Sequence, residues 1–319
     1  MQEVQDFFRR VIQQTRDAFK RVWQRRSDAT SVFTRAWQSS TASGANAWQQ
    51  RSGLSYQALV QYGELAAAVR FLSVLPMPRA ARTIEPDETR PDPVVGSGYF
   101  SLVGVLLALL LALWSLFLGA ALHLPSLMLA VLVLIALILL TGGLHLDGLM
   151  DSCDGLFGGT SREHKLEIMR DSRVGSFAVL GGVCALLFKF VAFAILADDP
   201  VTYHLPLALL IALPAARWAM VLVVYIFPSA RVAGLGPAFR DTVTVRRLIL
   251  AALVALIVAV IAGRLLGLLA LLGATLAALV VGVLATRVLG GLTGDVYGAV
   301  EEVSEMAALL VLVLLRTWF

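Results

Sequence analysis

The residues best suited to chemistry lie in the segment TGGLHLDGLMDSCDGLFGG, residues 141–159. On a helix, Asp147, Asp151 and Asp154 fall at positions i, i+4 and i+7, so their carboxylates share one face. Carboxylates this close repel one another unless a cation lies between them. Because ligation by oxygen alone favours Mg²⁺ or a similar hard metal, the spacing predicts a magnesium site.

Other residues of this segment could assist the aspartates. His145, two residues before Asp147, could act as a base or orient a carboxylate. Six glycines flank the same face and would allow tight turns and the approach of a bulky ligand: Gly142, Gly143, Gly148, Gly155, Gly158 and Gly159. The competing interpretation is a solvated acidic loop that follows a membrane helix.

A second polar segment, SREHKLEIMRDSRVGSF, covers residues 161–177. Its acidic residues fall on one helical face and its cations are Lys165, Arg170 and Arg173. Carboxylates for a metal beside cations for phosphate oxygens are what phosphoryl transfer requires. The alternative is a surface helix laced with ion pairs.

Two cations fall inside apolar stretches, Lys189 within 174–197 and Arg217 within 204–227. A charge in a membrane span is costly and is therefore a functional hypothesis by default, although it could instead snorkel or pair with a carboxylate. We expect Lys189 and Arg217 to contact the substrate, together with Lys165 and with Arg231 in the connection 228–247.

The last polar segment is GGLTGDVYGAVEEVSE, residues 290–305. If it is helical, Asp295, Glu302 and Glu305 lie on one side at i, i+7 and i+10. Asp295 and Glu302 are predicted to join the first three aspartates around one or two metal ions that clamp a diphosphate. The alternative is a set of carboxylates at a helix end that face water.

The chain that carries these residues has the composition of a membrane protein. Its 319 residues are 58% hydrophobic and 15% charged, whereas soluble domains carry roughly 25% charged residues. The sequence predicts an all-α, polytopic membrane bundle of about six or seven transmembrane helices. The apolar stretches that could span are 96–119, 121–142, 174–197, 204–227, 248–263, 265–286 and 306–319.

The distribution of Lys and Arg predicts the topology. Basic residues concentrate in the N-terminal region and in the connections 162–173 and 228–247, whereas the turns near 120–126 and 198–203 have none. Seven crossings with a cytoplasmic N-terminus put every basic connection inside. The polar segments would then meet at the cytoplasmic mouth of the bundle and form one site.

Residues 1–63 are predicted to form a basic extension and linker ahead of the membrane-embedded domain at 64–319. They carry nine Lys/Arg against four Asp/Glu. Residues 1–26 have the pattern of an amphipathic helix, which would be a membrane-surface anchor, an oligomerisation arm or a loosely ordered tail. No apolar leader follows Met1, so no signal peptide is expected, and Cys153 and Cys184 are expected to be reduced thiols.

Over residues 65–315 the sequence resembles the cobalamin synthases, which are adenosylcobinamide-GDP ribazoletransferases. The matching motifs are GGLHLDGLMDSCDG, LEIMRDSRVG, ARWAMVLVVYIFPSAR followed by GLG, and GGLTGDVYGA. The resemblance implies that α-ribazole, or its 5′-phosphate, attacks adenosylcobinamide-GDP to give adenosylcobalamin, or its phosphate, and GMP, with Mg²⁺ required. It implies functional roles for His145, Asp147, Asp151, Asp154, Arg170, Arg173, Asp295 and Glu302.

Two other functions compete with this one. Asp151-x-x-Asp154-Gly155 matches half of the signature of the CDP-alcohol membrane phosphotransferases, but the other half is missing nearby. A cation-coupled transporter should show internal repeats, and none is clear. We expect a bacterial inner-membrane enzyme with lipid around it and no nucleic-acid partner. Association with other late enzymes of cobalamin synthesis, and a homo-oligomer, stay open.

Overall fold

The described part of the chain is built from helices. The computed structural model describes residues 53–77, 95–198, 204–231 and 235–316, and residues 57–319 form one compact unit. Within these ranges every regular element is a helix, apart from one isolated bridge between Ser229 and Leu292. This confirms the predicted all-α class. The predicted amphipathic segment 1–26, and the linker 27–55 except its last three residues, lie outside the described ranges.

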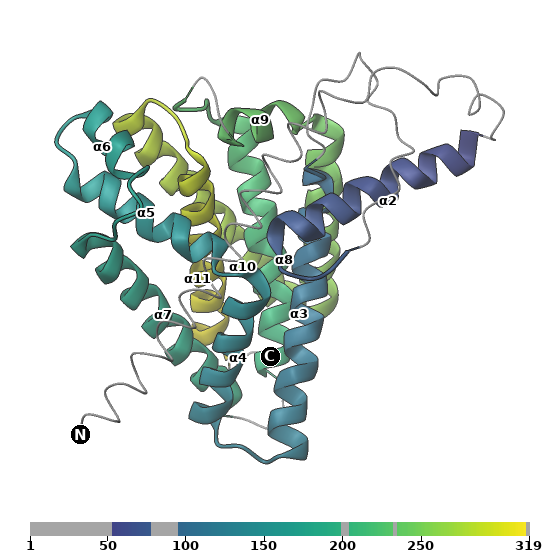
Figure 1. The fold of residues 1–319 in the computed structure, drawn as a ribbon. Coiled ribbons are helices and arrows are strands. Elements are labelled where there is room, and N and C mark those ends of the chain that lie inside the picture. Colours follow the sequence, from purple (N-terminus) through teal and green to yellow (C-terminus); the bar gives the residue numbers. More distant parts are fainter. Residues whose placement is uncertain (1–52, 78–94, 199–203, 232–234, 317–319) are drawn as a thin grey trace, which may run out of the picture. The chain divides into compact units, whose positions relative to one another are not determined.

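The elements follow one another along the chain as helices joined by short connections (Figure 1). In order they are α2 (Gly53–Leu72), η1 (Ser97–Tyr99), α3 (Phe100–Leu116), η2 (Phe117–Ala121), α4 (Ser126–Thr141), α5 (Leu144–Gly158), α6 (Arg162–Ile168), α7 (Ser176–Ala197), α8 (His204–Ile226), α9 (Leu235–Thr242), α10 (Val245–Leu289) and α11 (Gly294–Leu314).

Four helices of the described chain are long and apolar enough to cross a membrane: Ser97–Ala121, α7, α8 and α10. The pair α4 and α5 passes the same test together, but the two are bent by 88° and form either one broken span or a re-entrant loop. The structure therefore confirms a polytopic membrane protein. It gives four or five spans by this test, fewer than the six or seven predicted.

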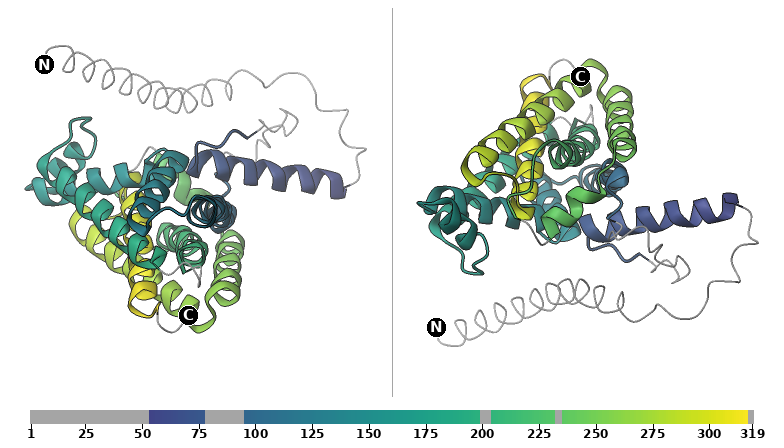
Figure 2. Two further views of the ribbon diagram at one scale, coloured as in Figure 1. Left: turned by 90° about the horizontal axis from the view of Figure 1, so that it is seen from below. Right: turned by 90° about the horizontal axis from the view of Figure 1, so that it is seen from above.

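The number of spans found differs from the number predicted because of α10 and α11. At about 1.5 Å per residue, the 45 residues of α10 are too long for one straight crossing of a 30 Å core. The helix breaks at Arg264, where φ is +49°, and the chain turns back so sharply that a Cβ on Gly267 would lie 1.9 Å from the carbonyl oxygen of Ala259. Figure 2 shows the two halves as separate stretches. They correspond to the predicted spans 248–263 and 265–286.

The predicted span 306–319 is not a separate helix. Its described residues continue α11, which begins at Gly294 and carries the late acidic residues between Asp295 and Glu305. Those buried carboxylates keep α11 out of the set of apolar spans.

Helix α8 lies at the centre of the bundle. It packs against α3, α10 and α11, and most of it is buried. Large apolar side chains on the surrounding helices point outward, among them Leu113 on α3, Leu187 on α7 and Ile261 on α10. Such exposed apolar surface suits contact with lipid.

The polar connections gather at the end of the bundle where α5 and α6 lie (Figure 1). The bridge between Ser229 and Leu292 joins the segment after α8 to the segment before α11. Arg162 of α6 donates hydrogen bonds to the carbonyl oxygens of Leu289, at 2.7 Å, and Ala230, at 3.1 Å. The three predicted polar segments therefore do meet, as the sequence predicted.

Candidate active site

The candidate site lies where two helices cross with no side chain between their backbones. After α4, Gly142 and Gly143 both adopt positive φ, +62° and +66°, and turn the chain into α5. Helix α5 then crosses α11 at Gly148 and Gly298, where a Cβ on Gly148 would lie 2.7 Å from the carbonyl oxygen of Asp295. Only glycine permits this contact, and it brings the aspartates of α5 beside Asp295.

The carboxylates at this crossing form one acidic cluster. Asp147 is exposed and Asp151 is half-buried on the same face of α5. Asp147, Asp154 and Asp295 all lie close enough to repel the charge of Asp151. Burial raises the pKa of Asp295, and the positive charge of Arg231 opposes this rise. The predicted crowding of like charges is therefore present, with Asp295 as its fourth member.

Two arginines lie next to the acidic cluster. A guanidinium nitrogen of Arg231 lies 3.9 Å from a carboxylate oxygen of Asp295 and donates a hydrogen bond to the carbonyl oxygen of Leu166. Arg170 is exposed, and it lies close enough to Arg231 for the two positive charges to repel each other. Cations beside carboxylates provide contacts for phosphate oxygens next to a metal.

Asp154 has a different setting from the other predicted metal ligands. It is buried, and its two carboxylate oxygens accept hydrogen bonds from the backbone N–H groups of Gly175 at 2.6 Å and Ala178 at 2.8 Å. These groups open α7, so Asp154 caps that helix. Its oxygens are thus engaged with the backbone of α7, whereas Asp147 and Asp151 lie nearer the surface.

Two further predicted cations make local contacts. The ammonium group of Lys165 donates to the carbonyl oxygen of Leu156 and so ties α6 to α5. Arg173 forms an ion pair with Asp171 at 2.6 Å on the surface, and this hydrogen-bonded pair lowers the pKa of Asp171. The described contacts of Lys165 and Arg173 therefore lie within the α5–α7 connection rather than at Asp151 or Asp295.

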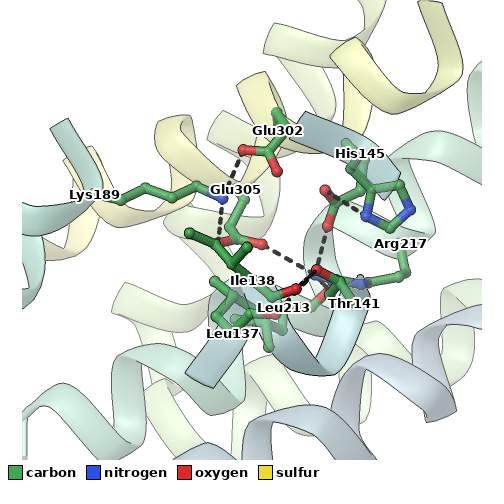
Figure 3. A network of polar contacts seen from close by, with 10 residues as sticks. Leu137, Ile138, Thr141, His145, Lys189, Leu213, Arg217, Glu302 and Glu305 are labelled. Carbon is green, nitrogen blue, oxygen red and sulfur yellow. Dashed lines mark hydrogen bonds and ion pairs between the residues drawn. The ribbon is translucent and has the colours of Figure 1, made fainter. Parts of the chain in front are cut away.

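A second polar group lies inside the bundle (Figure 3). Lys189 of α7 pairs with Glu302 at 2.7 Å and Glu305 at 2.9 Å. Arg217 of α8 contacts Glu305 at 3.1 Å and also pairs with Glu301. We call this group, completed by His145 of α5, the buried ion network: His145, Lys189, Arg217, Glu301, Glu302 and Glu305.

The buried ion network contains three of the predicted site residues. Glu302 was predicted to bind metal beside Asp295, but it pairs with Lys189 two helical turns away. Lys189 and Arg217 were expected to contact substrate, and both are at most 3% exposed and are paired with glutamates of α11. Pairing offsets the cost of a charge in an apolar environment, which was the alternative considered for these cations.

The sequence did not single out Glu301, which is 1% exposed and contacts both Arg217 and His145. The sequence does contain a pattern that indicates a buried role for Glu301. Three glutamates within five residues of an apolar helix need buried cations as partners. Lys189 and Arg217 were the cations available for that pairing.

The acidic cluster fits a magnesium ion by the chemistry of its donors. Among the described residues, no three His, Cys, Asp or Glu side chains lie close enough together to hold a metal ion by themselves. Mg²⁺ commonly takes one or two protein carboxylates and fills its other positions with water and substrate phosphates. Asp147, Asp151 and Asp295 are carboxylates of this kind, and Arg231 lies 3.9 Å from Asp295.

Comparison with known proteins places these residues in a family. The family of cobalamin-5-phosphate synthases matches residues 64–313. The chain is 36% identical over 251 residues to an adenosylcobinamide-GDP ribazoletransferase of Desulfitobacterium hafniense, covering 77% of this chain and 95% of that protein. A protein of the same name from Citrobacter koseri is 37% identical over 250 residues, covering 77% and 97%. No solved structure matches the chain.

The matched region contains both the acidic cluster and the buried ion network, and the resemblance seen in the sequence motifs is confirmed. The match covers most of this chain and nearly all of each relative. This membrane protein therefore belongs to the cobalamin-5-phosphate synthase family.

Proposed function

We propose that this chain is an adenosylcobinamide-GDP ribazoletransferase whose diphosphate site is the acidic cluster of α5 and α11. Two observations support this: its relatives carry that name, and the α5–α11 crossing sets Asp147 and Asp151 beside Asp295 with Arg231 adjacent. The crossing is the observation that carries the assignment of the site.

The reaction converts a diphosphate linkage into a phosphodiester. A ribose hydroxyl of α-ribazole, or of its 5′-phosphate, attacks the phosphorus bonded to the cobinamide moiety. A new P–O bond forms, the diphosphate P–O bond breaks, and GMP leaves with the bridging oxygen. The hydroxyl proton must pass to a base, and the products are adenosylcobalamin, or its phosphate, and GMP.

The residues of the cluster have separate tasks in this reaction. Asp151 and Asp295, with Asp147, would hold Mg²⁺, which when bound neutralises charge on the diphosphate. Arg231 and Arg170 bind phosphate oxygens and stabilise the negative charge that develops on the leaving GMP. A carboxylate of the cluster that does not hold the metal can accept the proton of the ribose hydroxyl.

We also place this site at the cytoplasmic face of the bacterial inner membrane. The connections that gather beside α5 carry Arg162, Lys165, Arg170, Arg173 and Arg231, whereas the α3–α4 turn at the other end carries no Lys or Arg. An excess of basic residues marks the inner side of membrane proteins. Nucleotide substrates would then reach the site from the cytoplasm.

The test supplies adenosylcobinamide-GDP, α-ribazole and Mg²⁺ to membranes that contain the protein and measures cobalamin and GMP. The wild type should form both in equal amounts, and EDTA should stop the reaction. Asp295→Asn should lower turnover roughly 100-fold, because a cation site worth several kcal/mol loses a ligand.

Asp198→Asn is the matched control for Asp295→Asn. Asp198 is an exposed aspartate that follows the last residue of α7, at the far end of that helix from its Asp154 cap. It should retain full activity. Near-normal turnover by Asp295→Asn at limiting Mg²⁺ would show that the acidic cluster is not the reaction site. If the wild type formed no cobalamin, the proposed function itself would be wrong.

A further inference from the structure

His145 lies where it can couple the buried ion network to the acidic cluster. Its side chain is 4% exposed and its Nδ1 atom lies 3.1 Å from a carboxylate oxygen of Glu301. In this contact Nδ1 is the atom that can donate, because a carboxylate without a proton only accepts hydrogen bonds. The contact joins α5 to α11 within one turn of the Gly148–Gly298 crossing.

The orientation of His145 argues against a role as the base at the acidic cluster. Two residues span about 200° around a helix, so His145 and Asp147 point to opposite sides of α5. Asp147 is exposed, whereas His145 faces a pocket lined by Thr141, Lys189, Arg217 and the glutamates of α11. Its Nε2 atom is buried and has no hydrogen-bond partner among the described residues.

Glu301 is held from two sides. One carboxylate oxygen meets His145 and the other meets Arg217, which is fully buried in α8 and also contacts Glu305 and the carbonyl oxygen of Leu213. An interaction between buried charges is costly to break, because it leaves an uncompensated buried charge. Glu301 therefore has a fixed position against α8, and through His145 it fixes α5.

The network joins the helices that carry the acidic cluster. His145 is two residues from Asp147 on α5, and Glu301 is six residues from Asp295 on α11, about 9 Å along the helix. Lys189 brings in α7, whose first turn is capped by Asp154 of α5. Between helices in lipid there is little hydrophobic driving force, so polar contacts and close packing set their relative positions.

We propose that His145 and Glu301 are positioning residues, whose polar contact holds α5 against α11 at their crossing and thereby keeps Asp147 and Asp151 at their spacing from Asp295. The inference rests on the proposed function. The imidazole of His145 then acts as a donor through Nδ1, and Nε2 takes no part in proton transfer. A side chain that keeps the Nδ1 donor should therefore replace histidine.

His145→Asn and His145→Ala form the decisive pair. The amide nitrogen of asparagine takes the place of Nδ1, whereas alanine removes the donor. His145→Asn should keep turnover within about threefold of the wild type and the same pH profile. His145→Ala should lose about 30-fold or more, since a misplacement of 1 Å can cost 10²-fold, and should need about tenfold more Mg²⁺ for half-maximal rate.

Glu301→Ala and the double variant with His145→Ala test whether the two residues act as one unit. The double variant should be no slower than the slower single variant, because removing either side chain already breaks the contact. If the fold-loss of turnover in the double variant equalled the product of the two single fold-losses, the residues would act independently and the proposal would be wrong. Thr141→Val is the control, because Thr141 lines the same pocket; it should have normal turnover.

Calorimetric titration of Mg²⁺ into the detergent-purified proteins needs no turnover, so it tests the positioning separately from the proposed reaction. His145→Asn should bind like the wild type and His145→Ala about tenfold more weakly. If His145→Asn accumulates but is as inactive as His145→Ala, or has lost the acidic limb of the pH profile, Nε2 is the base and the proposal is wrong. Failure of His145→Asn to accumulate also counts against it, because the amide keeps the proposed contact.

Discussion

At the scale of single residues, the three aspartates of α5 share one helical face but meet different surroundings. Asp147 is exposed, Asp151 is half-buried beside Asp295, and Asp154 is buried against the first turn of α7. Spacing alone made them equivalent, since i, i+4 and i+7 lie on one stripe. The neighbouring helices separate them into two residues of the proposed cation site and one that caps α7.

Asp154 should therefore matter for stability more than for metal affinity. Asp154→Ala removes the acceptor of two backbone N–H groups, and the loss of such a cap costs about 2 kcal/mol. We expect earlier thermal aggregation in detergent for Asp154→Ala and an intermediate value for Asp154→Asn, which keeps one acceptor oxygen.

Kinetics at low temperature separate the two roles of Asp154. Below its unfolding transition, Asp154→Ala should keep the wild-type Mg²⁺ requirement, whereas Asp295→Asn should not. A large rise in the half-saturating Mg²⁺ concentration for well-folded Asp154→Ala would return Asp154 to the set of metal ligands.

At the scale of secondary-structure elements, the backbone contact between Gly148 and Gly298 allows α5 and α11 to cross closely. A Cβ on Gly298 would lie 3.0 Å from the carbonyl oxygen of His145, and one on Gly148 would meet the backbone of Asp295 at 2.7 Å. Backbone atoms cannot rotate away as a side chain can. The absence of two methyl groups thus permits the close approach of α5 and α11.

Gly148→Ala should separate α5 from α11 and lower turnover at least tenfold, because overpacking shifts the backbone that carries Asp147 and Asp151. Gly158→Ala is its control on the same helix, since the added Cβ would make only an ordinary contact at 3.8 Å. The measurement is cobalamin formation per mole of folded protein. Equal turnover of the two variants would show that the close approach is not needed.

At the scale of the whole molecule, the helices gather the polar connections at one end, while the α3–α4 turn lies at the other (Figure 1). Thr160, which follows α5, is exposed, and Leu122 in the α3–α4 turn is 52% exposed. The two positions should therefore lie on opposite sides of the membrane if the basic end faces the cytoplasm.

Cysteine labelling tests this orientation. In a background of Cys153→Ser and Cys184→Ser, a membrane-impermeant maleimide should label Leu122→Cys in intact spheroplasts and Thr160→Cys only in inverted vesicles. The opposite labelling pattern would place the acidic cluster on the outer side of the membrane. If both cysteines were labelled from the same side, the chain would not cross the membrane between residues 122 and 160.

The sequence by itself determined the local features of this protein, because helical periodicity and apolar length act along the chain. It predicted the all-α membrane class, the break near Arg264, the shared face of Asp147 and Asp151, and the meeting of the polar segments. The tertiary structure decided which polar groups face one another. It paired Glu302 with Lys189, placed Asp154 on α7 and revealed Glu301, because the side of a helix that is buried depends on neighbours distant in the chain.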